Sequence, residues 1–308
     1  MAPSSRYTRI VRAMIVGVLL LISCAPAQEP PGLAAGIRAA DIRRHQEVLG
    51  SEELEGRGPG SEGSRKASDY IAARLREWGY LPAGTDGGWF QPFGEAKRNI
   101  AALHKGRSDE YVVLGAHYDH LGKKGEKVFP GADDNASGSS VLLDVADGVG
   151  KAMLGRSVLF LWFDAEENHL EGSRWWASHP TLPLEKCFAM VNIDMIGRNE
   201  TAKVFCGVQK TKAKEPVYPR LASALKEVEA AYGPPFDWTE FDPYIQRSDH
   251  WPFMEKGVPA LFFTGGMHPD YHKEGDRLEK INFEKEERVG KIVASLLEKV
   301  ANRTEPLK

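Results

Sequence analysis

The stretch YVVLGAHYDH, residues 111–120, combines a continuous apolar run with a polar end. A strand with one solvated face alternates polar and apolar residues, whereas a continuous apolar strand is typical of a sheet covered on both faces. Residues 111–120 therefore predict a buried strand of a parallel sheet, with histidine and aspartate side chains where the strand ends.

The same pattern recurs further along the chain. Three more apolar runs stop at polar residues or glycine: SVLFLWFDAEE (157–167), KCFAMVNIDMIG (186–197) and PALFFTGG (259–266). Stretches with helical character lie around them, at 37–50, 61–80, 139–153, 172–179, 218–233 and 283–303. Alternating strands and helices indicate an α/β fold, a three-layer αβα sandwich with a mostly parallel central sheet.

The N-terminal residues have the layout of a secretory signal. Three arginines precede an apolar run at 13–22, which is shorter than the ~20 residues of a membrane-spanning helix. We expect a signal peptide at 1–27 with cleavage before Gln28, or a lipoprotein signal to residue 23 that leaves Cys24 as a lipid anchor. In both cases the protein is exported, as a periplasmic, secreted or membrane-anchored lipoprotein form.

The rest of the chain has an ordinary globular composition. Residues 28–36 predict a linker and residues 37–308 a single domain without internal repeats. Loss of residues 1–27 moves the formal charge from −3 to −6, so there is no indication of a nucleic-acid partner. Cys187 and Cys206 either pair in an oxidising compartment or stay unpaired and buried, and the sequence sets no oligomeric state.

Histidines and carboxylates gather where the predicted strands end. They are His117, Asp119 and His120 after the first run, Asp164, Glu166 and Glu167 after the second, Asp194 after the third, and His268, Asp270, His272 and Asp276 after the fourth. The loop GADDNASG (131–138) adds Asp133 and Asp134. Ligands of open α/β sheets bind outside the carboxyl ends of the strands, so we expect these side chains at one rim.

Several carboxylates at one place repel one another unless a cation is present or some of them are protonated. Imidazole and carboxylate donors without thiolate suit zinc, cobalt or manganese. The donors outnumber the ligands of one tetrahedral zinc ion, which favours two metals that share a bridging carboxylate. One aspartate of the loop 131–138 is the candidate for that bridge, because its small neighbours allow a close approach.

Six motifs carry a family resemblance. In chain order they are GAHYDHLG, GADDNASG, FDAEENHLEGS, NIDMIGR, SDHWPF and DYHKEGD. Together they resemble the co-catalytic di-zinc aminopeptidase family, which is bacterial leucyl aminopeptidase-like and includes relatives of glutamate carboxypeptidase and glutaminyl cyclase. The resemblance runs from about Leu54 to the C-terminal helix. It implies a zinc-exopeptidase fold, here without a protease-associated insert.

The resemblance also implies a ligand set for two Zn²⁺ ions per chain, with Co²⁺ or Mn²⁺ as possible substitutes. It places His117 and Asp194 on one ion and Glu167 and His272 on the other. Asp133 is the residue that it implies as the bridge between the two ions. It also implies a cis peptide bond between Asp133 and Asp134.

Three further residues take catalytic roles by the same resemblance. Glu166 is the implied general base, Asp119 orients His117, and Tyr271 is implied to hydrogen-bond the oxyanion. The chain departs from the family pattern at 273–275, where Lys-Glu-Gly replaces the common Thr-Pro, which affects the loop but no ligand.

We therefore expect an exported zinc-dependent aminopeptidase that acts on peptides with a free N-terminus. One alternative is a glutaminyl-peptide cyclotransferase with one zinc ion, and another is a non-catalytic binding protein on the same scaffold. A carboxypeptidase would need a basic pocket, for which Arg198 and Arg247 are the candidates. Asp249 either shapes the pocket or caps a helix.

Overall fold

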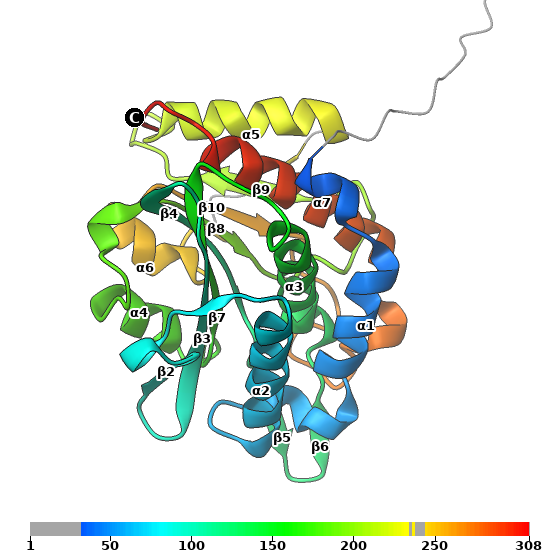
Figure 1. Cartoon of the computed structure of the whole chain (residues 1–308). Helices are drawn as coiled ribbons and strands as arrows, with labels where there is room; N and C mark the ends of the chain where they lie inside the picture. Colours follow the sequence, from blue (N-terminus) through cyan, green and yellow to red (C-terminus); the bar gives the residue numbers. More distant parts are fainter. Residues whose placement is uncertain (1–31, 234–235, 238–243, 308) are drawn as a thin grey trace, which may run out of the picture.

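Figure 1 shows the computed structural model, which describes residues 32–233, 236–237 and 244–307. The expected signal peptide at 1–27 and the anchor at Cys24 lie outside the described residues. Within the described part of the chain, no helix is both long and apolar enough to cross a membrane.

A sheet of eight strands forms the centre of the fold. Its order is β1-β3-β7-β4-β8-β10-β9, with β2 paired to β3. The strands are β1 (Leu81–Pro82), β2 (Phe90–Phe93), β3 (Lys97–His104), β4 (Ser108–His117), β7 (Arg156–Phe163), β8 (Cys187–Ile193), β9 (Phe205–Val208) and β10 (Ala260–Thr264). The four predicted strands β7, β4, β8 and β10 are parallel neighbours, and antiparallel strands flank them. This confirms the mostly parallel sheet.

Helices cover both faces of the sheet (Figure 1). On one face lie α1, α2, α3 and α7, with α5 packed on α7, and on the other lie α4 and α6. Their bounds are α1 (Ala39–Leu49), α2 (Glu62–Glu77), α3 (Gly138–Val149), α4 (Glu171–Ser178), α5 (Pro219–Tyr232), α6 (His250–Glu255) and α7 (Phe283–Ala301). A small hairpin, β5 (Gly122–Lys124) and β6 (Lys127–Phe129), lies outside the main sheet.

Capping residues set where two of the long helices begin. The Ser61 side chain accepts a hydrogen bond from the backbone N–H of Ser64 at the start of α2, and Ser61 is the first residue of the helical stretch expected at 61–80. Asn282 does the same for the N–H of Lys285 at the start of α7. Each cap satisfies a donor that has no partner inside the helix, which typically stabilises the protein by about 1 kcal/mol.

The central strands are buried on both faces. Val112, Leu114 and Phe160 belong to the apolar core that includes residues of α1, α2, α3 and α7. Their neighbours along the chain, among them Val113 and Leu161, belong to a second core with residues of α4 and α6. This double burial explains the continuous apolar runs. Truncating a core aromatic such as Phe160 to alanine should cost about 3–5 kcal/mol.

The strand register brings the polar ends together. His117, the last residue of β4, pairs with Phe163 at the end of β7, and Gly115 pairs with Asn192 near the end of β8. A Cβ at Gly115 would lie 2.8 Å from a ring atom of Phe163, so the close packing of the strands depends on glycine here. The residues that follow these strands therefore share one rim of the sheet.

The structure also bears on the expected domain boundary and on the two cysteines. Packing begins at Leu33, four residues before the expected domain boundary, because a 3₁₀ helix at Leu33–Gly36 buries Leu33 and Ala34. Cys187 and Cys206 are both buried and free, so the structure shows the unpaired alternative.

Candidate metal centre

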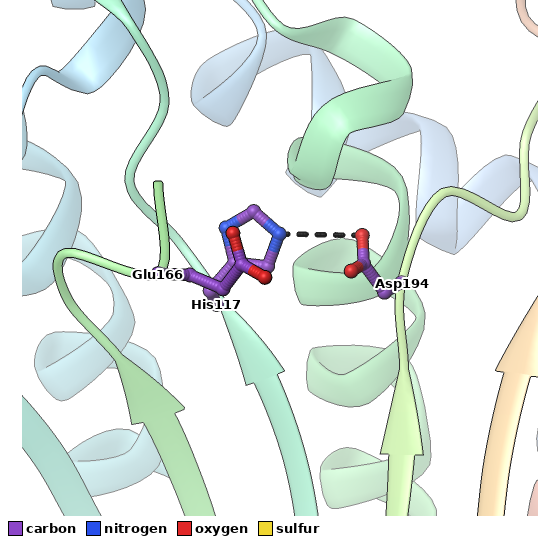
Figure 2. A group of neighbouring side chains, drawn as sticks. All are labelled: His117, Glu166 and Asp194. Atoms are coloured by element: carbon purple, nitrogen blue, oxygen red, sulfur yellow. Dashed lines mark hydrogen bonds and ion pairs between the residues drawn. The ribbon is translucent and has the colours of Figure 1, made fainter. Parts of the chain in front are cut away.

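One group of donors lies at the ends of β4, β7 and β8. Figure 2 shows His117 facing Asp194, with Glu166 beside the imidazole ring. His117 Nε2 is 3.2 Å from Asp194 Oδ1, and the donor atoms of all three residues lie within 4.8 Å of one another. Asp194 directly follows β8, and Glu166 lies two residues beyond Asp164, the first residue after β7.

A second group of donors lies next to the first. Glu167 Oε2 is 3.0 Å from His272 Nε2, and Glu167 Oε1 is 2.8 Å from His120 Nδ1. His272 comes from the loop after β10 and has a φ of 57°. His120 follows β4, and the sequence pattern places it at this rim without indicating its role.

Asp134 lies between the two groups. One carboxylate oxygen, Oδ1, is 3.5 Å from His117 Nε2, while the other, Oδ2, is 3.2 Å from His272 Nε2. Each oxygen thus faces a different group of donors, which is the arrangement that a bridging carboxylate requires.

The structure differs here from the expectation for Asp133. The Asp133 side chain points to another partner set, because Oδ1 accepts the N–H of Gly197 at 2.5 Å and Oδ2 lies 3.3 Å from His268 Nε2. The cis peptide bond also lies one residue later than expected, between Asp134 and Asn135. Adjacent aspartates in one loop point in different directions, so the backbone decides which of them faces the donors.

Two residues that the sequence did not single out for this purpose hold the loop. The Asp276 carboxylate accepts the backbone N–H groups of both Asp133 and Asp134 at 3.1 Å. Arg57, which is fully buried, donates to the backbone carbonyls of Pro130 and Gly131 at 2.8 Å and of Tyr118 at 2.7 Å. Hydrogen bonds to an ionised group contribute more than neutral ones, so these contacts order the loops that carry the donors.

Asp119 connects the two groups of donors. Its Oδ1 lies 3.4 Å from His117 Nδ1 and accepts the N–H of Glu166 at 3.1 Å. Its Oδ2 accepts the N–H of Glu167 at 3.4 Å. A single buried carboxylate therefore contacts an imidazole of one group and the backbone that carries Glu166 and Glu167.

A small cavity opens beside Asp134, Glu166 and Asp194. Its other lining residues are Met195, Tyr244, Arg247, Phe262, Thr264, Gly266, Met267 and Tyr271. The ring of Tyr271 stacks on that of His272 with centroids 3.7 Å apart. The two arginines that were candidates for a basic pocket differ in their surroundings. Arg198 pairs with Asp270 at 2.7 Å, whereas Arg247 lines the cavity and makes no ion pair with any described residue.

Asp249 does not use its side chain as a helix cap. It precedes α6, but its carboxylate makes no capping hydrogen bond, and both oxygens are buried without a partner among the described residues. Burial, together with the charges of Asp194 and Asp119, raises the pKa of Asp249 to about 7.

Crowding of carboxylates shapes the electrostatics of the centre. Burial and the charge of Glu167 raise the pKa of Asp134 to about 7. Burial also raises the pKa of Glu166, with the charges of Asp194 and Asp249 acting in the same direction. A bound cation would offset both effects, because it favours the ionised carboxylates.

The hydrogen bonding of the second group of donors indicates whether these side chains suit a metal ion. Four buried atoms of the second group of donors have no hydrogen-bond partner among the described residues: His120 Nδ1 and Nε2, Glu167 Oε1 and His272 Nε2. Buried polar atoms in folded proteins are almost always satisfied. Unsatisfied imidazole and carboxylate atoms that lie this close together suit a zinc-like cation as their common partner.

Comparison with known proteins identifies the family of this chain. The model of the family described as Peptidase family M28 matches residues 99–297. The chain belongs to peptidase family M28. This membership confirms the family that the motifs indicate, and the matched segment contains every one of the donors described above.

Individual relatives and solved structures are also similar to this chain. A probable leucine aminopeptidase of Trichophyton verrucosum is 28% identical to this chain over 70% of its residues. The aligned part spans 59% of the length of that relative. A zinc aminopeptidase from Bacillus subtilis has a TM-score of 0.69 and 17% identity, over 91% of this chain and 100% of the other. The glutaminyl cyclase of Porphyromonas gingivalis has a TM-score of 0.67 and 23% identity, over 86% and 99%. These structures confirm the fold class.

Proposed function

We propose that this M28 chain is an exported zinc-dependent aminopeptidase. The observation that carries the proposal is the position of Asp134, whose two oxygens face two separate groups of histidine and carboxylate donors. Glu166 and the cavity lie directly beside this pair of groups. The relatives named above support the aminopeptidase activity, since one is described as a probable leucine aminopeptidase and another as a zinc aminopeptidase.

Each of the two proposed zinc ions has its own residues. His117 and Asp194 would hold one ion, Glu167 and His272 the other, and Asp134, in place of the expected Asp133, would contact both. Bound zinc lowers the pKa of water and polarises a carbonyl group.

Two residues of the chain perform the proton and charge steps, and a third positions them. Glu166, beside His117 and Asp194, accepts a proton from the attacking water and later delivers it to the leaving amine. Asp119 holds the backbone of Glu166 and the ring of His117 in place. Tyr271 lines the cavity and donates its hydroxyl to the oxygen on which negative charge develops.

The cavity suits a peptide N-terminus. Asp134, Glu166 and Asp194 line the cavity, so a peptide bound there would place its N-terminal end at the proposed metal centre, which restricts cleavage to the chain end. Tyr244, Phe262 and two methionines offer apolar surface for the first side chain. The proposed substrates are therefore peptides with a free N-terminus and an apolar first residue.

Export is the part of the proposal that rests on the sequence alone. The arginines and the apolar run of residues 1–27 support removal of a signal peptide, with either Gln28 or lipidated Cys24 at the mature N-terminus. Mass spectrometry of the N-terminal peptide from cells that express the full chain tests this. A mature N-terminus elsewhere, or an intact Met1, would contradict export by either route.

The first test of the activity is metal content and hydrolysis in one preparation. The proposal requires about two zinc ions per chain, release of N-terminal residues from aminoacyl chromogenic substrates, and loss of that release on chelation. About one zinc ion with cyclisation of an N-terminal glutamine peptide would favour the cyclase, to which the structure is also similar. No metal and no turnover would favour a binding protein.

The second test separates chemistry from binding at Glu166. Glu166→Gln should keep the metal content and lower kcat by about 10²–10⁴-fold, the usual contribution of a general acid–base. Glu255→Gln is a matched control, because Glu255 is exposed and pairs with Arg174 on the surface. Unchanged kcat in Glu166→Gln would show that another group moves the proton.

A further inference from the structure

The imidazole of His120 is buried, and the hydrogen bonds of the fold do not account for its two nitrogens. The residue is 0% exposed, and neither ring nitrogen has a hydrogen-bond partner among the described residues. Leaving a buried donor or acceptor unsatisfied costs about 1–3 kcal/mol. The sequence pattern and the roles proposed above assign His120 no function.

The ring of His120 faces the donors that flank Asp134. His120 Nδ1 lies 2.8 Å from Glu167 Oε1 and 3.7 Å from Asp134 Oδ2. Its ring meets that of His272 edge-on, with centroids 5.7 Å apart. His120, Asp134 and Glu167 form a group whose donor atoms all lie within 4.8 Å of one another.

The contact with Glu167 is too poorly aligned to be a hydrogen bond. Nδ1 and Oε1 are 2.8 Å apart, yet neither atom has a hydrogen-bond partner in the part of the chain that the structure describes. The neighbouring pair His272 Nε2 and Glu167 Oε2 is similar, at 3.0 Å, and the His272 nitrogen also has no hydrogen-bond partner within residues 32–233, 236–237 and 244–307. Close, misaligned nitrogen and oxygen atoms are typical of ligands that share a cation.

The spacing of the four side chains agrees with one zinc ion. Ligand atoms of a tetrahedral zinc, with bonds of about 2.0–2.1 Å, lie about 3.3 Å apart. The nitrogen-to-oxygen distances among the four side chains are 2.8, 3.0, 3.2 and 3.7 Å. The set consists of His120, Asp134, Glu167 and His272.

The backbone makes room for this ring. Gly131 has a φ of 59°, and a Cβ at that position would lie 2.4 Å from His120 Cγ. The backbone N–H of His120 also donates to the carbonyl of Arg57 at 3.3 Å. The loop that carries Asp134 therefore passes directly over the imidazole.

We propose that His120 is a fourth protein ligand of the ion held by Asp134, Glu167 and His272. This inference rests on the proposed metal centre and adds a residue to it. Four protein ligands close the coordination of a zinc ion, as in structural sites, whereas His117, Asp194 and Asp134 leave a position open on the other ion. The two ions consequently differ in role and in affinity, and the ion at His120 is bound more tightly.

Paired substitutions distinguish a ligand from a packing residue. Asp and Asn have nearly the same shape, but Asp is the stronger zinc ligand and Asn is the better neighbour for the Glu167 carboxylate. As a ligand position, His120→Asp should bind Co²⁺ at the tighter site at least about tenfold more strongly than His120→Asn. If residue 120 only packs against Glu167, His120→Asn should bind Co²⁺ more strongly than His120→Asp.

The readout is cobalt binding to metal-free protein, not turnover. Wild type should bind two Co²⁺ in two separable steps, and His120→Asn should weaken the tighter step by more than about 100-fold, beyond the loss expected for an outer contact. The visible cobalt spectrum of the tighter site should change in the same variant. His179→Gln serves as control, because His179 lies on the surface against Trp175.

The possible failures are distinguishable. Wild-type affinities and spectra in His120→Asn would overturn the inference about His120 and leave the metal centre in place. A wild-type chain that binds no Co²⁺ would overturn the proposed function itself. If the substitutions unfold the chain, thermal unfolding of the metal-free proteins shows it, and His120→Gln then gives the same comparison with wild type.

Discussion

Arg57 donates a hydrogen bond through Nη2 to the backbone carbonyl of Gly131, three residues before Asp134, at 2.8 Å. Other donors of the same guanidinium bond to the carbonyls of Leu49, Tyr118 and Pro130. One buried cation thus ties the segment after α1 to the loops that follow β4 and precede α3. Burial lowers the pKa of Arg57 to about 10, so the group is still charged at neutral pH.

Arg57→Lys should therefore lower both stability and metal affinity. A lysine ammonium cannot make the planar fork of contacts, and each buried carbonyl left without a partner costs about 1–3 kcal/mol. Thermal unfolding with and without zinc, together with zinc titration, measures both effects. Arg65→Lys is the matched control, since Arg65 pairs with Glu62 on the exposed face of α2. Wild-type zinc affinity in a destabilised Arg57→Lys protein would show that the contact is structural only.

The two adjacent aspartates should behave differently. Asp134→Asn removes the carboxylate that faces both groups of donors, so we expect zinc content to fall for both ions and the zinc-dependent rise in Tm to disappear. Asp133→Asn keeps an oxygen that can accept the N–H of Gly197, and should bind zinc nearly as wild type does. Metal analysis of both variants decides the assignment, and the reverse result would restore Asp133 as the shared ligand.

The contrast between Asp133 and Asp134 shows how far the sequence alone predicts this centre. The apolar runs indicate the parallel strands, since a strand covered on both faces needs apolar residues throughout. The flanking strands β3 and β9 escape that pattern, because β3 begins and ends with polar residues and β9 has only four residues. Strand ends also indicate which histidines and carboxylates meet. Only the backbone of the loop decides which neighbouring side chain faces the donors.

Arg247 should discriminate between substrates by their charge. Its side chain lines the cavity beside Glu166 and makes no ion pair with any described residue. Dipeptides have a carboxylate near the scissile bond, and we expect Arg247 to donate a hydrogen bond to it. Because a hydrogen bond to a charged group contributes about 1.5–3 kcal/mol, Arg247→Gln should raise KM for dipeptides about 10–100-fold. Aminoacyl anilides lack that carboxylate, so their KM should not change, and Arg247→Lys should recover part of the dipeptide affinity. Equal losses for both substrates would exclude a role in carboxylate binding.

His45 should make the stability of the fold sensitive to acid, independently of the metal centre. Its Nδ1 is 2.8 Å from the Tyr70 hydroxyl, and burial, with the charges of Arg44 and Arg74, lowers the pKa of His45 to about 4. The other groups around it are Asp41 on α1, Trp78 just after α2, and Asp144 and Asp147 on α3.

The folded state thus favours neutral His45, whereas the unfolded chain takes up a proton near pH 6.5. Stability from this group is fully present above pH 6.5 and is lost as the pH falls towards 4, by at most about 1.4 kcal/mol per pH unit. His45→Gln cannot titrate, so the difference in free energy of unfolding between wild type and variant should shrink over this range. Denaturant unfolding of both proteins at several pH values measures the difference, and titration of Asp144 or loss of metal affects both proteins alike. A difference that stays constant between pH 7.5 and pH 4.5 would show that His45 has the same pKa in the folded and unfolded chain.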